Sequence, residues 1–264
     1  MNQARIDGAR RRLATLAPTV GAIEGLYGVP GPVIAAIWGV ETSFGANTGS
    51  FDMPRSLASL AFDGRRAALF TRELDAAVRM VGERGVPRDR LRGSWAGATG
   101  QPQFLPTSYL AHAVDGDGDG RADIWGSQAD TLASIAKYLS AGGWQRGQWW
   151  GMAVGLPPTF DRMRVRSIFR PAKCVRPLER HSRWLTAREW QALGVVSLTG
   201  AWPPDATPMT LVEPDGVGGD DFLTTGSFRS LLEYNCSNFY ALSVALIADG
   251  VRAADAPAAA ASLP

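Results

Sequence analysis

The sequence predicts a mainly α-helical (α+β) fold, with a helical core and a small irregular, β-containing insert. Two patterns predict it. Apolar residues recur at about every third or fourth position along residues 6–27 and 70–81, which is the spacing of one face of an α-helix, and residues 33–44 read as a very apolar helix. Residues 151–226 are instead rich in proline and glycine and carry only short apolar runs such as Met209–Val212. With 45% apolar residues and nine tryptophans, the chain can bury a sizeable core.

The first helical segment has a single apolar stripe, formed by Ile6, Ala9, Leu13, Leu16, Val20, Ile23 and Tyr27. Pro18 is expected to divide this segment, as an early residue of a second short helix. The sequence GVPGP at 28–32 then breaks the chain, and a very apolar helix, VIAAIWGVETSF, follows. Gly45 and the turn signal Asn47-Thr48-Gly49 are expected to end that helix.

The later segments continue the helical pattern with one interruption. Residues 56–81 predict two helices around Asp63-Gly64, and the second is expected to bury Phe70, Leu74, Ala77, Val78 and Val81. Residues 93–108 are punctuated by glycine and proline and predict a loop that frames a cleft. After an aspartate–glycine run, a helix is predicted with one apolar face, made by Leu132, Ile135, Ala136 and Leu139.

The last third of the chain is expected to be less regular. Residues 151–226 predict an irregular subdomain with a short strand or two, inserted into a core of about 20–150 and 227–250. A last helix at about 237–249 precedes an Ala/Pro-rich tail, residues 251–264, which is expected to be disordered. The sequence therefore predicts a single domain over residues 1–250, made of this core and the irregular subdomain.

Composition and charge narrow the classes of function. The net charge is only +2 and the arginines are scattered, so no nucleic-acid partner is expected. No apolar stretch approaches the roughly 18–20 residues that a membrane span needs. The first residues carry charges but no apolar h-region, so we expect that the signal or anchor of an exported protein is absent from this chain. Cys174 and Cys236 could form one disulfide or remain two buried thiols, and the sequence leaves both open.

Glu41 is the candidate catalytic acid. Most other glutamates stand among arginines and polar residues, as on a solvated surface, whereas Glu41 ends an apolar run that includes Ile37, Trp38 and Val40. Burial and the negative end of the helix dipole both disfavour the charged carboxylate, so both are expected to raise its pKa. A carboxyl that is partly protonated near neutral pH can protonate the leaving oxygen of a glycosidic bond. The alternative is a glutamate that caps neighbouring backbone.

The segment GSWAGATGQPQFLPTSY, residues 93–109, is a candidate sugar-binding loop. Its glycines remove side chains where backbone could approach a ligand. Ser94 and Gln103 offer neutral hydrogen-bonding groups, and flat apolar faces come from Trp95, Phe104 and Tyr109. Sugars present hydroxyls at their edges and C–H groups on their faces, so this mixture suits them. The alternative is a loop whose glycines only permit tight turns.

The segment DGDGDGRADIW, residues 115–125, matches a calcium-binding loop at most positions. Position twelve, normally a bidentate glutamate, is Gly126, and Asp130 at the start of the next helix could close the site instead. The candidate ligands are therefore Asp115, Asp117, Asp119, Arg121, Asp123 and Asp130. The expected role of the ion is structural, and the alternative is an acidic turn that binds nothing firmly.

The segment LLEYNCSNFYALSVAL, residues 231–246, places Tyr234-Asn235 and Tyr240 around a helix start where Ser237 is the expected N-cap. By themselves these tyrosines could equally be core residues. With two histidines and no CxxC, HExxH or phosphate-binding loop, the chain does not have the residues of a zinc hydrolase or a nucleotide-dependent enzyme.

Taken in order, these blocks resemble the lytic murein transglycosylases of the membrane-bound B type, from about residue 20 to 250. YGVPGPVIAAIWGVETSFGANTGSF resembles the catalytic-glutamate helix of that family, and GSWAGATGQPQFLPTSYLAHAVDGDGDGRADIW its glycine and calcium-type loops. LASLAFDGRRAALFTREL, SIAKYLSAGGW and FLTTGSFRSLLEYNCSNFYALSVALIADGV are similar to the helices between and after them. The chain departs from the family pattern at Ser227, where asparagine is expected, and at Cys236, where asparagine or histidine is commoner.

The resemblance implies a lysozyme-like core that cuts the β-1,4 bond between N-acetylmuramic acid and N-acetylglucosamine of peptidoglycan. It implies a non-hydrolytic cleavage that leaves 1,6-anhydromuramoyl ends, with Glu41 as the single acid/base and with no cofactor required for the chemistry. Carried over by position, the cleft-lining residues are Ser94, Gln103, Tyr138, Tyr234, Asn235 and Tyr240. The expected partners are peptidoglycan glycan strands and other cell-wall enzymes, with the chain itself a monomer, in the periplasm or cell envelope.

Two other functions stay open at this point. A muramidase would hydrolyse the same bond with water and would need a second positioned carboxylate, for which Asp52 and Asp63 are the next acidic residues. A glycan-binding module without turnover would keep the cleft alone. Retention of Glu41, Ser94 and Gln103 together speaks against that second alternative.

Overall fold

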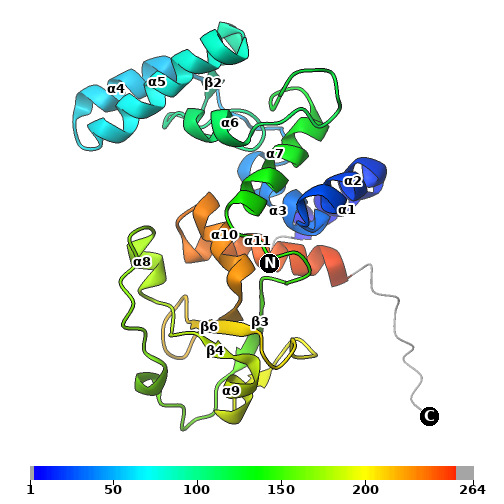
Figure 1. Ribbon diagram of the computed structural model, residues 1–264, viewed down its shortest axis with the longest axis vertical. Helices are drawn as coiled ribbons and strands as arrows, with labels where there is room; N and C mark the ends of the chain where they lie inside the picture. The colour runs from blue at the N-terminus through cyan, green and yellow to red at the C-terminus, as the bar shows by residue number, and fades with distance from the viewer. Residues whose placement is uncertain (1–2, 254–264) are drawn as a thin grey trace. The chain divides into compact units, whose positions relative to one another are not determined.

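The computed structural model describes residues 3–253, and the chain divides into two compact units (Figure 1). The first unit runs to Tyr138 and resumes at Leu246, and the second unit is Leu139–Ala245. Of the tail expected to be disordered, residues 251–253 continue a helix, and residues 254–264 lie outside the described part of the chain.

Helices dominate the first unit. They are α1 (Gln3–Thr15), α2 (Ala17–Tyr27), α3 (Gly31–Thr42), α4 (Met53–Asp63), α5 (Ala67–Arg84) and α6 (Pro106–His112). A short antiparallel pair, β1 (Phe51–Asp52) with β2 (Arg92–Gly93), and the 3-10 turn Arg88–Arg90 lie between them in sequence. The helices α7 (Gln128–Ala141) and α11 (Asn238–Ala253) cross the boundary between the units.

The second unit combines a small sheet with short helices. Its strands are β3 (Gly151–Gly155), β4 (Leu185–Thr186), β5 (Val196–Ser197), β6 (Pro208–Val212) and β7 (Asp221–Thr224). Its helices are the 3-10 turn Arg162–Val165, α8 (Val175–Leu178), α9 (Ala187–Ala192) and α10 (Gly226–Tyr234). The predicted mainly α-helical class with a small β-containing insert is confirmed.

The break between the first two helices lies where the sequence predicts, whereas α3 ends at Thr42, two residues before the expected Phe44. Pro18 stands in the first turn of α2, and Gly28 ends that helix in the left-handed conformation. The next helix, α3, is buried along most of its length, which explains its very apolar sequence. Among the described residues no single helix is long and apolar enough to cross a membrane, although α2 and α3 meet that test jointly across a 108° bend.

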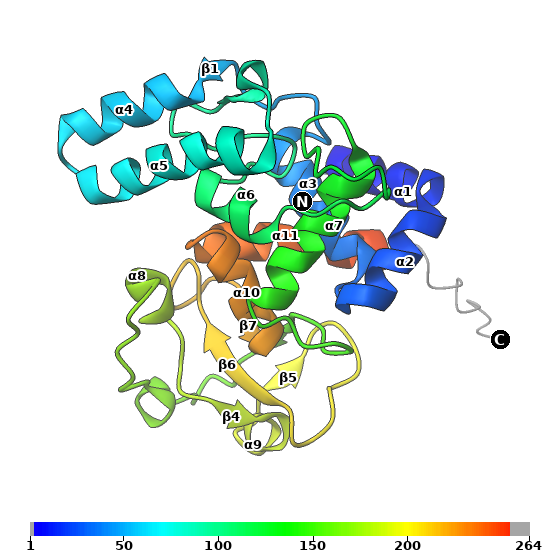
Figure 2. The same cartoon turned by 45° about the horizontal axis from the view of Figure 1, so that its top comes forward.

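The buried face of α5 differs from the prediction. α4 and α5 lie side by side (Figures 1 and 2), but Val78 and Val81 are exposed, and the buried residues of α5 are Glu73, Ala76, Ala77 and Met80. The reason is Glu73, which is 1% exposed and accepts hydrogen bonds from the backbone N–H and the hydroxyl of Thr107, in the first turn of α6. These bonds turn the Glu73 side of the helix inward, whereas the sequence pattern predicted burial of the side that carries Val78 and Val81.

Residues 151–226 contain more sheet than the expected strand or two. The five strands form one antiparallel sheet in the order β4-β6-β7-β3-β5, with Leu211 and Met152 both paired to Leu223. One face packs on Trp190 of α9, which is fully buried, and on Val165. Each strand has only two to five residues, so periodicity alone could not reveal them, and pairing between distant segments stabilises them.

Candidate functional site

The C-terminal end of α3 places Glu41 at a half-buried position, next to the last residue of the helix. The chain then leaves the helix through two left-handed residues, Ser43 and Phe44. Phe44 folds its ring back against α3, edge-on to Trp38 at 5.5 Å between ring centroids. A side chain at Gly39 would overlap that ring, which explains a glycine two residues before the glutamate.

The residues after α3 lie against the glycine loop. Gln103, in the left-handed conformation, donates from Nε2 to the carbonyl oxygens of Thr48 at 3.0 Å and of Gly100 at 2.9 Å. Gly49 comes so close to the backbone of Gly93 and Ser94 that no side chain fits there. The structure therefore brings the segment that follows Glu41 together with two of the predicted sugar-binding residues, Ser94 and Gln103.

Ser94 is part of a tight turn within this loop. Its backbone N–H donates to the Ala98 carbonyl at 2.8 Å, and its hydroxyl oxygen accepts from the Ala98 N–H at 3.1 Å. The turn is compact because Gly93 has no side chain: a Cβ there would overlap the Ala98 carbonyl oxygen. The half-buried Ser94 hydroxyl is thus held in one place by backbone geometry.

The three aromatic residues proposed as sugar faces have different environments. Trp95 is 62% exposed and can meet a ligand. Phe104 and Tyr109 are buried, so the expectation that they face a sugar is wrong. The Tyr109 hydroxyl donates to the Ala122 carbonyl at 3.0 Å, and its ring packs on Trp125. Both rings are core residues: Tyr109 packs against the acidic loop, and Phe104 contacts Tyr138 of α7.

Tyr138 lies half-buried near the end of α7, as the last residue of the first segment of the first unit. Its ring contacts that of Phe104, with centroids 5.6 Å apart, and the imidazole of His112, at 4.5 Å. The structure thus groups Tyr138 with the glycine loop through Phe104.

One residue of this region was not singled out by the sequence patterns. Gln101 is 6% exposed, and its amide oxygen accepts a hydrogen bond from the Trp38 indole N–H at 2.8 Å. Its backbone carbonyl accepts from the Thr42 hydroxyl at 2.9 Å. A polar residue between two glycine- and proline-rich stretches has no periodic signal, so only its long-range contacts reveal it.

The acidic loop brings three of its predicted ligands together. Asp115, Asp117 and Asp130 each place a carboxylate oxygen within 4.8 Å of the others. Asp130 is fully buried and accepts from the backbone N–H groups of Gly116 at 2.8 Å and Asp123 at 2.6 Å. Burial raises the pKa of Asp130, against the lowering effect of these backbone bonds. Three hard oxygen donors at this spacing fit a divalent cation such as calcium.

Two of the other predicted ligands accept hydrogen bonds from backbone N–H groups of the loop. Asp119 accepts from the backbone N–H of Arg121 at 2.8 Å, and Asp123 accepts from those of Trp125 and Gly126. Asp119, Arg121 and Asp123 do not belong to the carboxylate group formed by Asp115, Asp117 and Asp130. A side chain at Gly126 would meet the Asp123 carboxylate, so this glycine fits the turn that Asp123 closes.

The second unit carries the remaining predicted residues around the junction of α10 and α11. Tyr234 ends α10, and Asn235 is its C-cap. The rings of Tyr234 and Tyr240 stack almost in parallel, with centroids 6.4 Å apart and planes 8° from each other. Both tyrosines are half-buried, and Asn235 is exposed. Ser237, the expected N-cap, has an oxygen that accepts from the Tyr240 backbone N–H at 3.3 Å.

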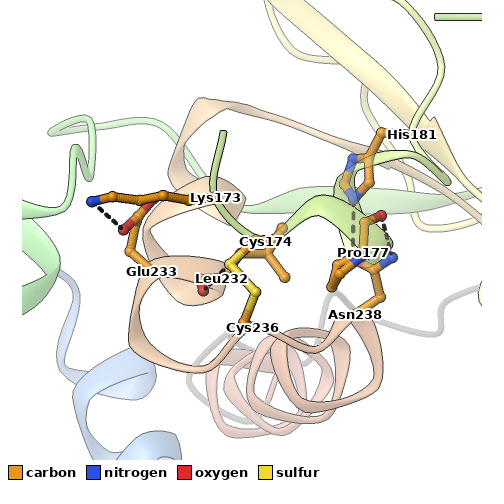
Figure 3. The surroundings of a disulfide bond; sticks show 8 residues. All are labelled: Lys173, Cys174, Pro177, His181, Leu232, Glu233, Cys236 and Asn238. Carbon is orange, nitrogen blue, oxygen red and sulfur yellow. Dashed lines mark hydrogen bonds and ion pairs between the residues drawn. A yellow bond between two sulfur atoms is a disulfide. The ribbon is translucent and has the colours of Figure 1, made fainter. Parts of the chain in front are cut away.

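A disulfide between Cys174 and Cys236 adjoins this junction (Figure 3), which resolves the pairing that the sequence left open. It joins the segment before α8 to the residue directly after Asn235. The departure from the family pattern at Cys236 is explained by this partner. Close by, the Asn238 side chain donates to the Pro177 carbonyl at 3.0 Å and lies 3.0 Å from the imidazole of His181.

Comparison with known proteins finds a family match over most of the chain and a curated relative over about half of it. The transglycosylase SLT domain family matches residues 1–249. Membrane-bound lytic murein transglycosylase B of Escherichia coli (strain K12) is 40% identical over 141 residues, 51% of this chain and 39% of that protein.

Two solved structures share the fold. SltB3 from Pseudomonas aeruginosa, in complex with NAG-anhNAM-pentapeptide, matches with a TM-score of 0.85 and 38% identity over 96% of this chain and 64% of that one. Escherichia coli Slt35, in complex with calcium, matches with a TM-score of 0.78 and 25% identity, over 97% of this chain and 77% of that one. The chain thus spans less than two thirds of SltB3 and of the E. coli transglycosylase B.

Proposed function

Because this chain belongs to the transglycosylase SLT domain family, we propose that it is a peptidoglycan lytic transglycosylase with Glu41 as its single acid/base. It cleaves the β-1,4 bond between N-acetylmuramic acid and N-acetylglucosamine and leaves 1,6-anhydromuramoyl ends. The observation that carries this proposal is the position of Glu41. It is a half-buried carboxyl at the end of an apolar helix, beside the glycine loop that carries Ser94 and Gln103.

Two proton transfers suffice for this reaction. Glu41 protonates the glycosidic oxygen as the bond to the leaving sugar breaks. The resulting carboxylate then takes the proton from the C6 hydroxyl of the muramoyl residue, and that oxygen closes the anhydro ring at C1. The N-acetyl group of the substrate stabilises the positive charge that develops at C1, as in other substrate-assisted glycosidases. Glu41 ends the cycle protonated again.

The alternative function, a hydrolytic muramidase that uses two carboxylates, is less well supported. Asp52 caps α4 by accepting from the Arg55 backbone N–H at 3.0 Å, and it pairs with Arg88 at 2.6 Å. These bonds, the Arg55 backbone bond first, hold the pKa of Asp52 below its ordinary value. Asp63 is the exposed last residue of α4. Both acids have ordinary structural or surface roles, which favours a mechanism with one acid/base group.

The substrate is proposed to be the glycan strand of peptidoglycan. Ser94, Gln103 and Tyr138 in the first unit, and Tyr234, Asn235 and Tyr240 in the second, are its proposed binding residues. Hydroxyl, amide and stacked aromatic groups are the ones that bind sugars in other sites. A relative, SltB3, binds NAG-anhNAM-pentapeptide, which supports the same class of ligand here.

Calcium is proposed as a structural ion held by Asp115, Asp117 and Asp130, with no part in the chemistry. The convergence of their carboxylates and the calcium complex of Slt35 support this role. When bound, the ion would offset the mutual repulsion of these carboxylates.

The proposed location is the periplasm or cell envelope, since the relatives act on cell-wall polymer and a disulfide is typical of an oxidising compartment. The chain is proposed to act there as a monomer on glycan strands, alongside other cell-wall enzymes.

Product analysis tests the proposal. Purified sacculi are digested with the parent protein, with Glu41→Gln and with Glu83→Gln, a control at an exposed glutamate of α5. Mass spectrometry should find anhydro ends, one water lighter than reducing ends, with the parent and the control and not with Glu41→Gln. Reducing ends alone would indicate a muramidase. Cleavage by Glu41→Gln at the parental rate would exclude Glu41 as the acid, and glycan binding without cleavage by the parent would indicate a binding module.

A further inference from the structure

The polar groups of Gln101 hold the end of α3 on both sides of Glu41. Trp38 precedes Glu41 by one helical turn, and its indole N–H donates to Gln101 Oε1 at 2.8 Å. Thr42 follows Glu41 directly, and its hydroxyl donates to the Gln101 backbone carbonyl at 2.9 Å. The same hydroxyl oxygen accepts from the Gly45 N–H at 2.9 Å. The turn that carries Glu41 is therefore bonded at two points to one residue of the glycine loop.

The remaining groups of Gln101 bind the end of the acidic loop. Its backbone N–H donates to the Ile124 carbonyl at 2.9 Å, and Nε2 donates to the Trp125 carbonyl at 3.1 Å. Trp125 is itself bonded through its indole N–H to the Thr99 hydroxyl at 2.9 Å. Gln101 thus uses both of its backbone groups and both ends of its side chain, in a place where it is 6% exposed.

This arrangement determines where Glu41 lies. A buried donor or acceptor that loses its partner is costly, so Trp38 and Thr42 are kept in the one position that satisfies Gln101. Gly45 strengthens the constraint, because a side chain there would overlap the Gln101 amide. A displacement of a catalytic group by about 1 Å can cost about 100-fold in rate, so such a constraint matters for a general acid.

We propose that Gln101 is a positioning residue for Glu41. It does not touch the substrate; it holds the last turn of α3 against the glycine loop and joins both to the acidic loop at Trp125. This inference rests on the role proposed above for Glu41, and it adds a residue that neither the sequence patterns nor the proposed binding set contains.

Two substitutions at residue 101 test the proposal. Gln101→Met keeps the side-chain volume but leaves the Trp38 N–H and the Trp125 carbonyl without partners. It should lower kcat by about 10- to 100-fold while KM for the glycan stays nearly unchanged, measured well below its unfolding midpoint. Gln101→Glu keeps an oxygen for the Trp38 N–H and should recover part of the lost kcat. If residue 101 had a merely structural role, its substitution would lower the unfolding midpoint without lowering kcat selectively over KM.

A matched pair of tryptophan variants covers the case in which Gln101→Met does not fold. Trp38 and Trp190 are both fully buried, and the Trp190 indole N–H donates to the Met209 carbonyl at 3.1 Å in the second unit. Trp38→Phe and Trp190→Phe each remove one such hydrogen bond. Trp38→Phe should lower kcat several-fold more than Trp190→Phe, and equal effects would overturn the proposal.

The Glu41→Gln variant distinguishes a wrong positioning role for Gln101 from a wrong catalytic role for Glu41. If Glu41→Gln is inactive and Gln101→Met cleaves at the parental kcat, the positioning role is wrong and the proposed function stands. If Glu41→Gln cleaves like the parent, the role of Glu41 is wrong, whatever residue 101 does.

Discussion

His181 Nε2 lies 3.0 Å from the side-chain oxygen of Asn238, the first residue of α11. The Asn238 amide nitrogen donates to the Pro177 carbonyl, so its oxygen is the acceptor and the imidazole carries its proton on Nε2. On the other side, Nδ1 lies 3.1 Å from the Thr210 hydroxyl. The imidazole, 3% exposed, therefore joins the sheet to the start of α11 as a neutral ring.

The acid stability of the protein should depend on His181. Burial first, and then the charge of Arg229, lower its pKa to about 3, against the effect of the Asn238 bond. The folded state thus holds its proton less tightly than the unfolded state, whose pKa is near 6.5. The stabilisation is complete above pH 6.5 and is lost as the pH falls from there towards 3, by up to about 1.4 kcal/mol per pH unit. Urea unfolding at a series of pH values measures this.

The matched variant for that experiment is His181→Gln. It should be less stable than the parent at pH 7.5, because two buried hydrogen bonds change. Between pH 6.5 and 4 its free energy of unfolding should fall less steeply than that of the parent, by the contribution of one proton. Identical slopes in the two proteins would show that His181 does not titrate in this range.

Reduction of the disulfide should destabilise the second unit. Cys174 and Cys236 are 62 residues apart in sequence, and closing a loop of that length restricts the unfolded chain by about 4 kcal/mol in the chain-entropy model. Adding dithiothreitol should therefore lower the free energy of unfolding by about 2–4 kcal/mol. Chemical denaturation with and without the reductant measures the difference.

The control is the double variant Cys174→Ser with Cys236→Ser. It should match the reduced parent and show no response to dithiothreitol. A parent protein with the same unfolding midpoint in both conditions would contradict a stabilising disulfide.

Calcium should raise the thermal unfolding midpoint of the protein. Asp117 and Asp130 lie in the same carboxylate group as Asp115, and a bound cation stabilises the state that binds it. Asp117→Asn should weaken or remove the calcium response. Asp89→Asn, at an exposed acid outside this group, should retain it. Calorimetry in calcium and in a chelator measures both, and a response of Asp117→Asn equal to that of the parent would exclude Asp117 as a ligand.

Gly93 should be intolerant of any side chain. A Cβ at this position would overlap the Ala98 carbonyl oxygen, which belongs to backbone and cannot move aside cheaply. Gly93→Ala should therefore lower the free energy of unfolding by about 1–3 kcal/mol and displace the Ser94 turn. The matched control is Gly21→Ala in α2, where nothing lies within 4 Å of an added Cβ. That change should stabilise by about 0.5–1 kcal/mol. A neutral Gly93→Ala would mean that the 93–98 turn relaxes freely.

Local patterns predicted the helices well, because helix spacing and turn chemistry are properties of neighbouring residues. Pro18 and the GVPGP break occur as expected, and α3 ends two residues earlier than predicted. The acidic run predicted a calcium-type loop or a plain acidic turn, and the structure contains a turn in which the Asp115 oxygens accept from the backbone N–H groups of Gly118, Asp119 and Gly120. The burial of Glu73 and Tyr109 could not be predicted, because each depends on a partner elsewhere in the chain.

By itself, the sequence determined the helical class, the apolar helix whose last turn carries Glu41, and the glycine and acidic loops, since each is encoded in a short run of residues. Only the tertiary structure decided that Gln101 hydrogen-bonds to Trp38 and Thr42, on either side of Glu41 in sequence. It also decided that Cys236 pairs with Cys174 and that five short strands join in one sheet. Those contacts join segments tens of residues apart, and the burial that makes them strong exists only once the chain has folded around them.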